Sequence, residues 1–407
     1  MTNSIFDFIQ SEAYRQFLFK YGTDDVAKLR LKQFDKLPFD KNLAITQIEC
    51  RRKAINKIPE LAEKIVFPTD VSIEQCTSEQ LAKFHASLFD GCDTLVDLTC
   101  GLGVDSYYLS QQVKQMWSIE ANPTVASAAE YNFSRLGRKN IHVVNLTAEE
   151  FTQSPLPCHI SAMFVDPSRR LQSDTKIRTY SINQTVPDLS IVIPNIIGKC
   201  DFLIVKASPM VDITQTLRDF QRITDIWVLA LKNDCKELLF KIDLTDKVIN
   251  RMPTIHTINF DAKGQQMFDY SYGETVTAEY ANPTQGGLLC VPNSAVMKAG
   301  AYGHIASAFG AKQISANSHL LTTEAVVEAE FPGKVYRIAG LFSFSKSDIK
   351  RLKEMAKSAS ISCRNIPLSP DELRKRLKIG DGGNFHIFAT TLSNGGKTLI
   401  LCEPAFV

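Results

Sequence analysis

The sequence lacks both an excess of charge and a long apolar run. Its 46 Lys and Arg residues nearly balance 44 Asp and Glu, giving a net charge of +2, so any surface that attracts nucleic acid must be local. No apolar run reaches the length of a membrane span, so we expect no membrane partner. The N-terminus carries Asp7 and no basic stretch, so we expect no signal peptide.

Paired cysteine motifs are also missing. The ten cysteines are scattered singly, no C-x-x-C occurs, and no group of cysteines and histidines has zinc-ligand spacing. We therefore expect free thiols, a cytoplasmic location and no metal site. Internal repeats and low-complexity tracts are absent too. What remains is an ordinary globular composition, 44% hydrophobic and 22% charged, over 407 residues, which predicts two to four domains.

The most informative feature is a glycine turn between a short apolar strand and a helix. A predicted strand over 94–98 leads into Gly101 and Gly103, and a helical pattern follows at once. Glycines let the backbone approach a ligand closely, and the N-terminal amides of the helix face it. The next predicted strand, 115–119, is followed by Glu120, an acid placed to bind both ribose hydroxyls of an adenosine. Together the two motifs predict an adenosine cofactor.

The kind of cofactor follows from what this turn lacks. A dinucleotide fingerprint needs a third glycine, and Ser106 stands there instead. Asp97 and Asp105 flank the turn, where carboxylates would repel a pyrophosphate and suit a cationic ligand. The alternatives are an NAD site and an α/β domain that binds no nucleotide.

The pattern Asp97-x-Thr99-x-Gly101-x-Gly103-x-Asp105, followed by Glu120-Ala121-Asn122, resembles the class I S-adenosylmethionine (AdoMet)-dependent methyltransferases. The resemblance implies that the glycine turn borders the methionine part of AdoMet and that Glu120 holds its ribose. We expect cofactor contacts from Asp97, Thr99, Gly101, Gly103, Asp105, Glu120, Ala121 and Asn122. Glu149 stands where the family often has an acid near the adenine amino group, although the neighbouring Glu150 leaves the register open.

A polar segment over 72–79 precedes the glycine turn. In many similar methyltransferases such a segment folds over the cofactor carboxylate or the mouth of the substrate site. We therefore expect cofactor contacts from Gln75 and Ser78, with Thr77 as a further candidate. The alternative is that Thr77 or Ser78 only caps the helix that follows, predicted over 80–88.

Strands and helices alternate from residue 94 to about 243, which predicts a parallel, doubly wound α/β sheet. Two apolar segments, 224–231 and 236–242, predict a final antiparallel hairpin. A reversed last strand is a feature of the class I methyltransferase sheet that a dinucleotide dehydrogenase sheet lacks. The predicted fold is therefore a Rossmann-like, seven-stranded sheet with a reversed last strand, an N-terminal helical region and C-terminal α+β modules.

The C-terminal part resembles the THUMP-like domain attached to a family of bacterial methyltransferases. The segments that carry the resemblance are Cys363–Gly383 and Phe385–Phe388, and the segment Pro292–Gly300 also resembles sequences of that family. The resemblance implies a small ferredoxin-like module before the THUMP-like domain. We therefore expect four regions: an N-terminal helical region at 1–90, an AdoMet-dependent methyltransferase domain at 91–275, the ferredoxin-like module at 276–328 and the THUMP-like domain at 329–407.

The acceptor of the methyl group is expected at the end of the fourth strand, where Asp166-Pro167-Ser168-Arg169-Arg170 stands. Class I enzymes that act on nucleobases carry an N/D-P-P-aromatic motif there. By that resemblance we expect Asp166, Pro167 and Arg169 to take part in catalysis. Asp166 would orient the acceptor, and Arg169 or Arg170 would pair with a substrate phosphate. Ser168 and Arg169 depart from the motif, which weakens the analogy with exocyclic amine methylation. A plain Asp-Pro turn is the alternative.

Asp-Pro-x-Arg also resembles a motif of enzymes that methylate pyrimidine carbon 5. Those enzymes need a cysteine nucleophile after the fourth or fifth strand. Here the fifth strand leads into Val205–Met210, which contains no thiol, and Cys158 precedes the fourth strand. Methylation through a cysteine adduct is therefore disfavoured. Lys206, at the end of the fifth strand, is either a phosphate contact or a solvated side chain.

The sequence therefore predicts an AdoMet-dependent methyltransferase that acts on RNA, either tRNA or rRNA, at a nitrogen or oxygen atom. The RNA part rests on the THUMP-like resemblance, with local support from Arg374-Lys375-Arg376 and Lys378 on one predicted helix. A solvated helix is the alternative there. One rival is a small-molecule or protein methyltransferase with the C-terminal half as a lid. A second rival, a catalytically idle scaffold, is disfavoured by the intact glycine turn.

Overall fold

The structure of the protein is a computed structural model, and it describes residues 9, 11–34, 36–169, 185–245, 251–325 and 331–405. The chain divides into two compact units. The first consists of Met1–Ala207, Arg218–Arg222 and Lys241–Ile249, and the second of Ser208–Leu217, Ile223–Phe240 and Asn250–Val407. No helix within the described ranges is long and apolar enough to cross a membrane.

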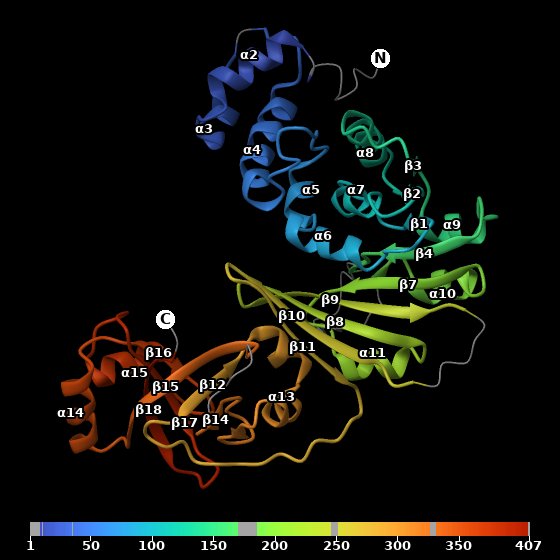
Figure 1. The fold of residues 1–407 in the computed structure, drawn as a ribbon. Coiled ribbons are helices and arrows are strands. Elements are labelled where there is room, and N and C mark those ends of the chain that lie inside the picture. Colours follow the sequence, from blue (N-terminus) through green and yellow to red (C-terminus); the bar gives the residue numbers. More distant parts are fainter. Residues whose placement is uncertain are drawn as a thin grey trace, which may run out of the picture. The chain divides into compact units, whose positions relative to one another are not determined.

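Over residues 11–90 the structure describes five helices of the first unit, drawn in blue in Figure 1. They are α2 (Glu12–Tyr21), α3 (Val26–Leu31), α4 (Lys41–Lys57), α5 (Asp70–Gln75) and α6 (Glu79–Ser87). Side chains of Ser11, Asp25, Asp40 and Thr69 accept backbone hydrogen bonds at the starts of the first four, which fixes where those helices begin. Two basic side chains of α4 have partners within this unit: Arg52 donates to the carbonyl of Gly22, and Lys53 pairs with Glu49.

The helices are followed by five parallel strands in the order β7-β4-β1-β2-β3. Their bounds are β1 (Thr94–Asp97), β2 (Gln115–Ile119), β3 (Ile141–Val144), β4 (Ile160–Val165) and β7 (Cys200–Ala207). The connecting helices are α7 (Val104–Leu109), α8 (Pro123–Arg135), α9 (Ala148–Gln153) and α10 (Leu189–Ile196). Two short antiparallel strands, β5 (Ser168–Arg169) and β6 (Thr185–Val186), form a separate ribbon after β4.

Among the described residues this sheet has nine strands, in the order β11-β10-β8-β9-β7-β4-β1-β2-β3, where we predicted seven. Four further strands extend the sheet: β8 (Ile223–Leu231), β9 (Asp234–Asp243), β10 (Thr254–Asp261) and β11 (Gly264–Ser271). The helix α11 (Ile213–Asp219) lies between β7 and β8 in the sequence. The prediction of seven was wrong because the hairpin of β10 and β11 joins the same sheet, with β10 pairing in parallel with β8. The nearly continuous burial of β10 fits a position inside a sheet.

In its described part, the second unit contains a seven-stranded sheet in the order β13-β14-β12-β15-β18-β17-β16. Its strands are β12 (Leu288–Pro292), β13 (Lys312–Gln313), β14 (Leu321–Thr323), β15 (Gly333–Phe342), β16 (Ser360–Cys363), β17 (His386–Thr391) and β18 (Lys397–Pro404). Two short helices, α12 (Ser294–Ala299) and α13 (Tyr302–Ala308), follow β12. Since β12 pairs with β15, strands that we assigned to two separate modules share one sheet.

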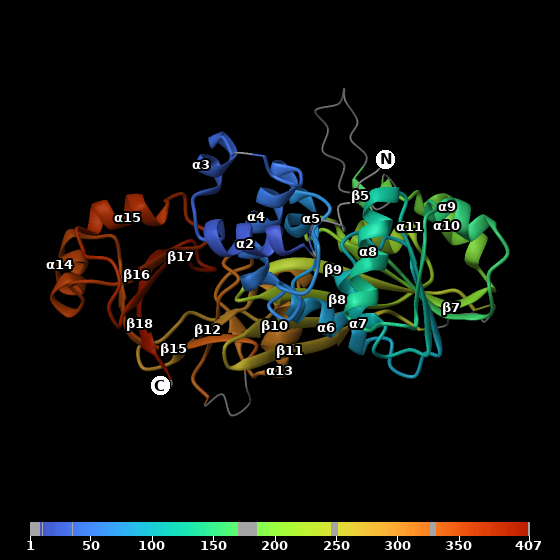
Figure 2. The same cartoon turned by 90° about the horizontal axis from the view of Figure 1, so that it is seen from above.

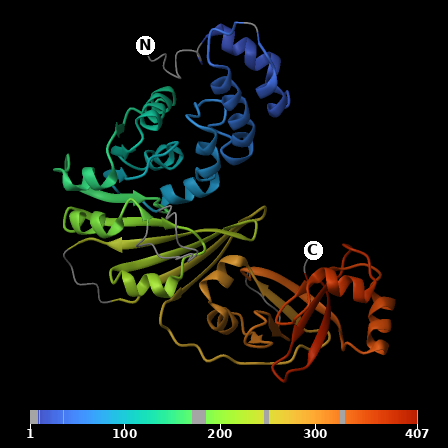
Figure 3. The ribbon, with the colours of Figure 1, turned by 180° about the vertical axis from the view of Figure 1, so that it is seen from behind.

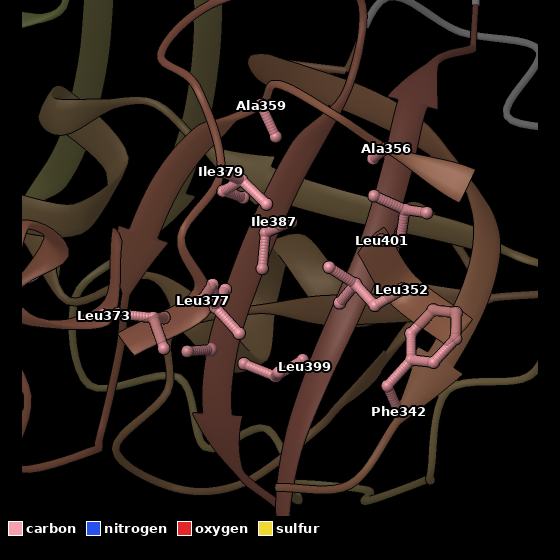
Figure 4. Packing of buried hydrophobic residues seen from close by; sticks show 11 residues of the cluster. Phe342, Leu352, Ala356, Ala359, Leu373, Leu377, Ile379, Ile387, Leu399 and Leu401 are labelled. Carbon is pink, nitrogen blue, oxygen red and sulfur yellow. The ribbon is translucent and has the colours of Figure 1, made fainter. Parts of the chain in front are cut away.

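Two helices pack on this second sheet. Figure 2 shows α14 (Lys346–Met355) and α15 (Pro370–Leu377) beside β16, β17 and β18, and Figure 3 shows them from behind. Leu352 of α14 and Leu373 and Leu377 of α15 are fully buried against Ile387 and Leu401 of the strands (Figure 4). The buried leucines recur at helical spacing, so each helix keeps its opposite face, which carries most of its charges, exposed.

Candidate active site

Functional side chains gather where the parallel strands of the first unit end. Parallel strands present their carboxyl ends at one edge of a sheet, which is where ligands bind in open α/β sheets. Glu120 follows β2, Asp166 follows β4, and Lys206 belongs to the last residues of β7. A cavity of about 700 Å³ opens there, a size that suits a nucleoside-sized ligand. Its walls come from residues between 69 and 77, 98 and 105, 119 and 125, and 146 and 149, with Asp166, Ser168, Val186 and Pro187.

The glycine turn takes backbone conformations that favour glycine. Gly101 has φ of +54° and Gly103 has φ of +84°, both in the left-handed region. A Cβ atom at Gly103 would stand 2.6 Å from Cζ of Phe133, on α8, so this position also lacks room for a side chain. Around Gly101, by contrast, the space is open, so only the backbone conformation favours glycine at this position. The turn therefore presents bare backbone to the cavity, as a cofactor cradle requires.

Glu120 fastens this turn to the next strand. Its carboxylate accepts hydrogen bonds from the backbone N–H of Gly101 at 2.9 Å and of Asn122 at 2.8 Å. A carboxylate offers about four acceptor sites, so two ribose hydroxyls can still donate to it. Asn122 in turn caps α8 through its side-chain oxygen. Glu120, Ala121 and Asn122, three of the residues from which we expect cofactor contacts, all line the cavity.

Helix capping distinguishes the two neighbouring acids after β3, Glu149 and Glu150. Thr147 and Glu150 form a capping box at the start of α9, so Glu150 serves the helix. Glu149 lines the cavity, and its Oε1 accepts a hydrogen bond from the backbone N–H of Asp188 at 2.7 Å. This bond ties the wall after β3 to the segment that enters α10. Of the two neighbouring acids, Glu149 is the one that lines the cavity.

Asp97 does not line the cavity, so the direct cofactor contact that we expected from it is not seen. Its side chain is fully buried, and its carboxylate accepts from the backbone N–H of Thr99 at 2.9 Å and from Oγ of Ser106 at 2.6 Å. Burial raises the pKa of Asp97 to about 7, although both hydrogen bonds oppose that rise. Asp97 therefore shapes the start of the turn from behind.

Asp105 lines the cavity, but both of its carboxylate oxygens are already engaged by protein groups. Oδ2 accepts from Oγ1 of Thr77 at 2.5 Å, and Oδ1 lies 2.8 Å from Nδ1 of His85. Burial alone would raise the pKa of Asp105, but the charge and hydrogen bond of His85, with smaller contributions from Lys206 and Thr77, lower it to about 2. Asp105 therefore has a structural role, because it links Thr77 to His85.

The other predicted residues divide between the cavity wall and its surroundings. Gln75 and Thr99 line the cavity, and Oγ1 of Thr99 accepts from the backbone N–H of Asp166 at 2.7 Å. Ser78 is the N-cap position of α6, makes no side-chain capping bond and does not line the cavity. Pro167 is likewise not among the lining residues. The backbone of Arg169 belongs to β5, while its side chain, like all of Arg170, lies outside the described part of the structure.

Lys206 is placed differently from either expectation. It is only 9% exposed, and its Nζ lies 2.7 Å from Oδ2 of Asp166 and 2.8 Å from Oγ1 of Thr77. Neither a phosphate contact nor a solvated lysine describes it. The signal that would have found this pair is topological, because the ends of the fourth and fifth parallel strands are neighbours at one edge.

The charge on the described part of the cavity wall is of one sign. Four acids line it, Asp105, Glu120, Glu149 and Asp166, and no Lys, Arg or His among the described residues does so. Such a wall disfavours the pyrophosphate of a dinucleotide and suits a cation. AdoMet carries a sulfonium and an ammonium group, so the donor set and the bare glycine turn fit AdoMet. Gly101, Gly103 and Glu120 would hold it, with Glu149 at its adenine end.

Three family models match parts of the chain. A tRNA (uracil-5-)-methyltransferase model matches residues 83–188, a ferredoxin-like domain model matches 289–332, and a THUMP domain-like model matches 333–404. A tRNA/tmRNA (uracil-C(5))-methyltransferase of Saccharophagus degradans is 34% identical over 97 residues, which are 20% of this chain and 27% of that protein.

Two relatives span nearly the whole chain. An uncharacterised S-adenosylmethionine-dependent methyltransferase of Mycobacterium tuberculosis is 21% identical over 376 residues, covering 87% of this chain and 95% of its own. A crystal structure from Porphyromonas gingivalis W83, described as a "putative methyltransferase", is 30% identical with a TM-score of 0.85, and the match covers 97% of this chain and 98% of that one.

The fold, the glycine turn and these relatives define a class I, AdoMet-dependent methyltransferase, and AdoMet is its cofactor. Within that class the chain belongs to the family of the P. gingivalis protein, and its residues 333–404 match the THUMP domain-like model.

Replacing Glu120 by Ala should weaken AdoMet binding by about 1.5–3 kcal/mol, because charge-assisted hydrogen bonds to the ribose are lost. Calorimetric titration measures this directly. Glu130→Ala is the matched control, since Glu130 is an exposed acid on α8 that does not line the cavity. Equal affinity of the Glu120 variant and the control would rule out the ribose contact.

Asp97 should make stability depend on pH. Its folded-state pKa of about 7 exceeds the ordinary value of 3.8, so the folded protein binds this proton more tightly than the unfolded chain does. The stabilisation is complete below about pH 4 and is lost as pH rises to 7, with a slope of up to about 1.4 kcal/mol per unit. Asp97→Asn should therefore gain stability relative to the natural protein between pH 5 and pH 8 in denaturant titrations. A constant difference between the two would contradict the shifted pKa.

Proposed function

We propose that the protein transfers a methyl group to a nitrogen or oxygen atom of RNA without forming a cysteine adduct. When bound, AdoMet supplies a methyl group already activated by the positive sulfur, so the protein must mainly position the acceptor. The observation that carries the proposal is that Asp166 lines the same cavity as the glycine turn and Glu120. Its carboxylate is 38% exposed, which leaves it accessible to an acceptor that enters beside the cofactor.

Asp166 has the chemistry that an acceptor N–H or O–H requires. A carboxylate accepts a hydrogen bond from such a group, orients its lone pair and can take its proton as the methyl group arrives. The backbone of Asp166 is held to Thr99, and its side chain to Lys206, so both parts of the residue are fixed. We propose Arg169 as a contact to the substrate phosphate, and assign to Pro167 the fixed backbone angle that shapes the turn after Asp166.

The charge distribution supports RNA as the substrate class. Residues 333–404, the part that matches the THUMP domain-like model, contain thirteen Lys and Arg against six Asp and Glu, a net charge of +7. The whole chain has a net charge of +2, so the remainder carries −5. A local excess of positive charge is the footprint of a polyanion-binding surface. Binding of tRNA or rRNA by this region, in a cytoplasmic protein, is therefore part of the proposal.

The basic surface differs from the one that the sequence indicated. Arg374 is engaged within its own unit, because its guanidinium donates to the carbonyls of Ala359 and Gly380 and pairs with Asp381 at 2.6 Å. Exposed lysines on and beside α14 and α15 remain as candidates for phosphate contacts: Lys346, Lys350, Lys357, Lys375 and Lys378. Two neighbouring helices thus replace the single helix of the sequence-based hypothesis.

Neutralising three of these lysines should weaken RNA binding in a salt-dependent way. In the triple variant with Lys346, Lys350 and Lys375 changed to Gln, the slope of log affinity against log salt should fall by about two to three units. Fluorescence anisotropy with total tRNA measures the slope. The control is the triple Gln variant at the exposed residues Lys28, Lys64 and Lys139. Equal slopes in the two triple variants would refute the assignment to α14 and α15.

A second candidate is methylation of uracil at carbon 5, favoured by the family model that matches residues 83–188. That reaction needs a thiolate that adds to carbon 6 of the base. Two thiols line the described part of the cavity, and burial raises the pKa of Cys76 to about 11 and that of Cys100 well above its usual range. Both are therefore protonated at neutral pH, which leaves them poor nucleophiles.

Trapping separates the two candidates. An enzyme that attacks carbon 6 and methylates carbon 5 stays covalently attached to 5-fluorouracil, because fluorine at carbon 5 does not leave as a proton would. Incubation with AdoMet and 5-fluorouracil-substituted RNA should yield no complex that survives a denaturing gel. A stable complex would overturn the proposal in favour of carbon methylation.

The proposed reaction itself is tested with radiolabelled AdoMet and total RNA from cells that lack the protein. We expect the natural protein to label this RNA, and Asp166→Ala to lose turnover while its AdoMet affinity stays within a few-fold. If Asp166→Ala labels RNA normally, the Asp-Pro segment is only a turn. If the natural protein labels no RNA but labels a protein or small-molecule fraction, the RNA assignment fails.

Two finer features of the architecture also belong to this proposal. We propose that β9, joined to β8 by the two-residue turn of Lys232 and Asn233, is the reversed strand of the class I sheet. The division into regions 1–90, 91–275, 276–328 and 329–407 is likewise proposed. The break between the two C-terminal family models, at residues 332 and 333, falls close to its last boundary.

A further inference from the structure

A continuous chain of hydrogen bonds runs beneath the cavity. Nδ1 of His85 lies 2.8 Å from Oδ1 of Asp105, whose Oδ2 accepts from Oγ1 of Thr77 at 2.5 Å. Oγ1 of Thr77 accepts from Nζ of Lys206 at 2.8 Å, and the same ammonium donates to Oδ2 of Asp166 at 2.7 Å. Five side chains are thereby joined: His85 of α6, Asp105 of α7, Lys206 of β7, and Thr77 and Asp166 of two loops.

The directions of these bonds are mutually consistent. A carboxylate only accepts, so Nδ1 of His85 donates to Asp105. The single hydroxyl hydrogen of Thr77 is used toward Asp105, so its oxygen is available to accept from Lys206. An ammonium only donates, so it can serve Thr77 and Asp166 at once. A hydroxyl at position 77 and a cation at position 206 are therefore both required to complete the chain.

The position of this chain relates it to the reaction. Asp105 and Thr77 line the cavity on the side of the glycine turn, and Asp166 lines it where we place the acceptor. Lys206 is nearly buried, His85 is fully buried and Thr77 is 5% exposed, so the bonds are shielded from water. A shielded ammonium that holds one oxygen of Asp166 restricts rotation of that carboxylate.

We propose that Lys206 and Thr77 are positioning residues that hold the Asp166 carboxylate toward the methyl acceptor. They do so by linking it to the Asp105–His85 pair on the cofactor side. Neither residue needs to touch AdoMet or the acceptor. This inference rests on the proposed function only in giving Asp166 the acceptor, and its structural part is independent of the substrate.

The matched variants follow from the bonds. Thr77→Ser keeps the hydroxyl, while Thr77→Val keeps the shape and removes it. Lys206→Arg keeps a cationic donor, while Lys206→Met removes it. Lys114→Met is the control, because Lys114 also pairs with an aspartate, Asp93, at 2.8 Å, but that pair is exposed and neither residue lines the cavity.

Transfer of radiolabel from AdoMet to total RNA of cells lacking the protein gives the kinetic readout. Lys206→Met and Thr77→Val should lower kcat by about 10- to 100-fold, as expected for a displaced catalytic group. Their AdoMet affinity by calorimetry should stay within about threefold. Thr77→Ser should keep most of the activity, and Lys206→Arg should recover part of it. The double variant should be no slower than Lys206→Met, because both changes break one chain.

Crystal structures of Lys206→Met and Lys206→Arg with AdoMet give a readout that does not depend on the substrate. The Asp166 side chain should turn away from its present position in the Met variant and keep it in the Arg variant. An unchanged Asp166 in Lys206→Met, or full kcat in Thr77→Val, would overturn the inference. If the natural protein labels no RNA, the proposed function fails, while the position of Asp166 in these structures still decides the inference.

Discussion

The site depends on one constraint, that parallel strands end at the same edge of their sheet. Because β1, β2, β4 and β7 run in one direction, the glycine turn, Glu120, Asp166 and Lys206 converge from segments more than 100 residues apart. Hydrogen bonds then hold the ends of these strands to one another. Glu120 holds the turn after β1, and Thr99 holds the backbone of Asp166. The cavity is thus a product of strand order.

Acidic and basic side chains are concentrated in different parts of the chain. The described cavity wall carries four acids, which suits a cationic cofactor and would repel RNA phosphates. Residues 333–404 carry a net charge of +7, which suits those phosphates. On our account the acceptor group alone enters the acidic cavity, while Arg169 and lysines of the C-terminal region contact the RNA phosphates. The near-neutral net charge of the whole chain conceals this division.

Much of the fold follows from local sequence patterns. The strand over 115–119 appears as β2, and the two segments predicted over 224–231 and 236–242 appear as β8 and β9. The number of strands in the sheet was not predictable in the same way. Nothing within residues 254–271 indicates that the hairpin of β10 and β11 extends an existing sheet, because strand pairing is a long-range property.

The candidate site was predictable where one short motif carried it. Gly101, Gly103 and Glu120 lie where the motif placed them, and all three line the cavity. Roles that depend on distant partners were missed. Thr77 and Lys206 are 129 residues apart in sequence, so no local pattern pairs them. Arg374 was similarly assigned to phosphates because its bonds to Gly380 and Asp381 are formed only in the folded unit.

The most direct test of the account compares the nucleosides of RNA from cells with and without this protein. Digested tRNA and rRNA are analysed separately by mass spectrometry. The account predicts that one nucleoside methylated at nitrogen or oxygen disappears from one RNA class and returns when the natural gene is restored, but not when Asp166→Ala is supplied. Loss of 5-methyluridine, or identical methylated nucleosides in both cell lines, would contradict it.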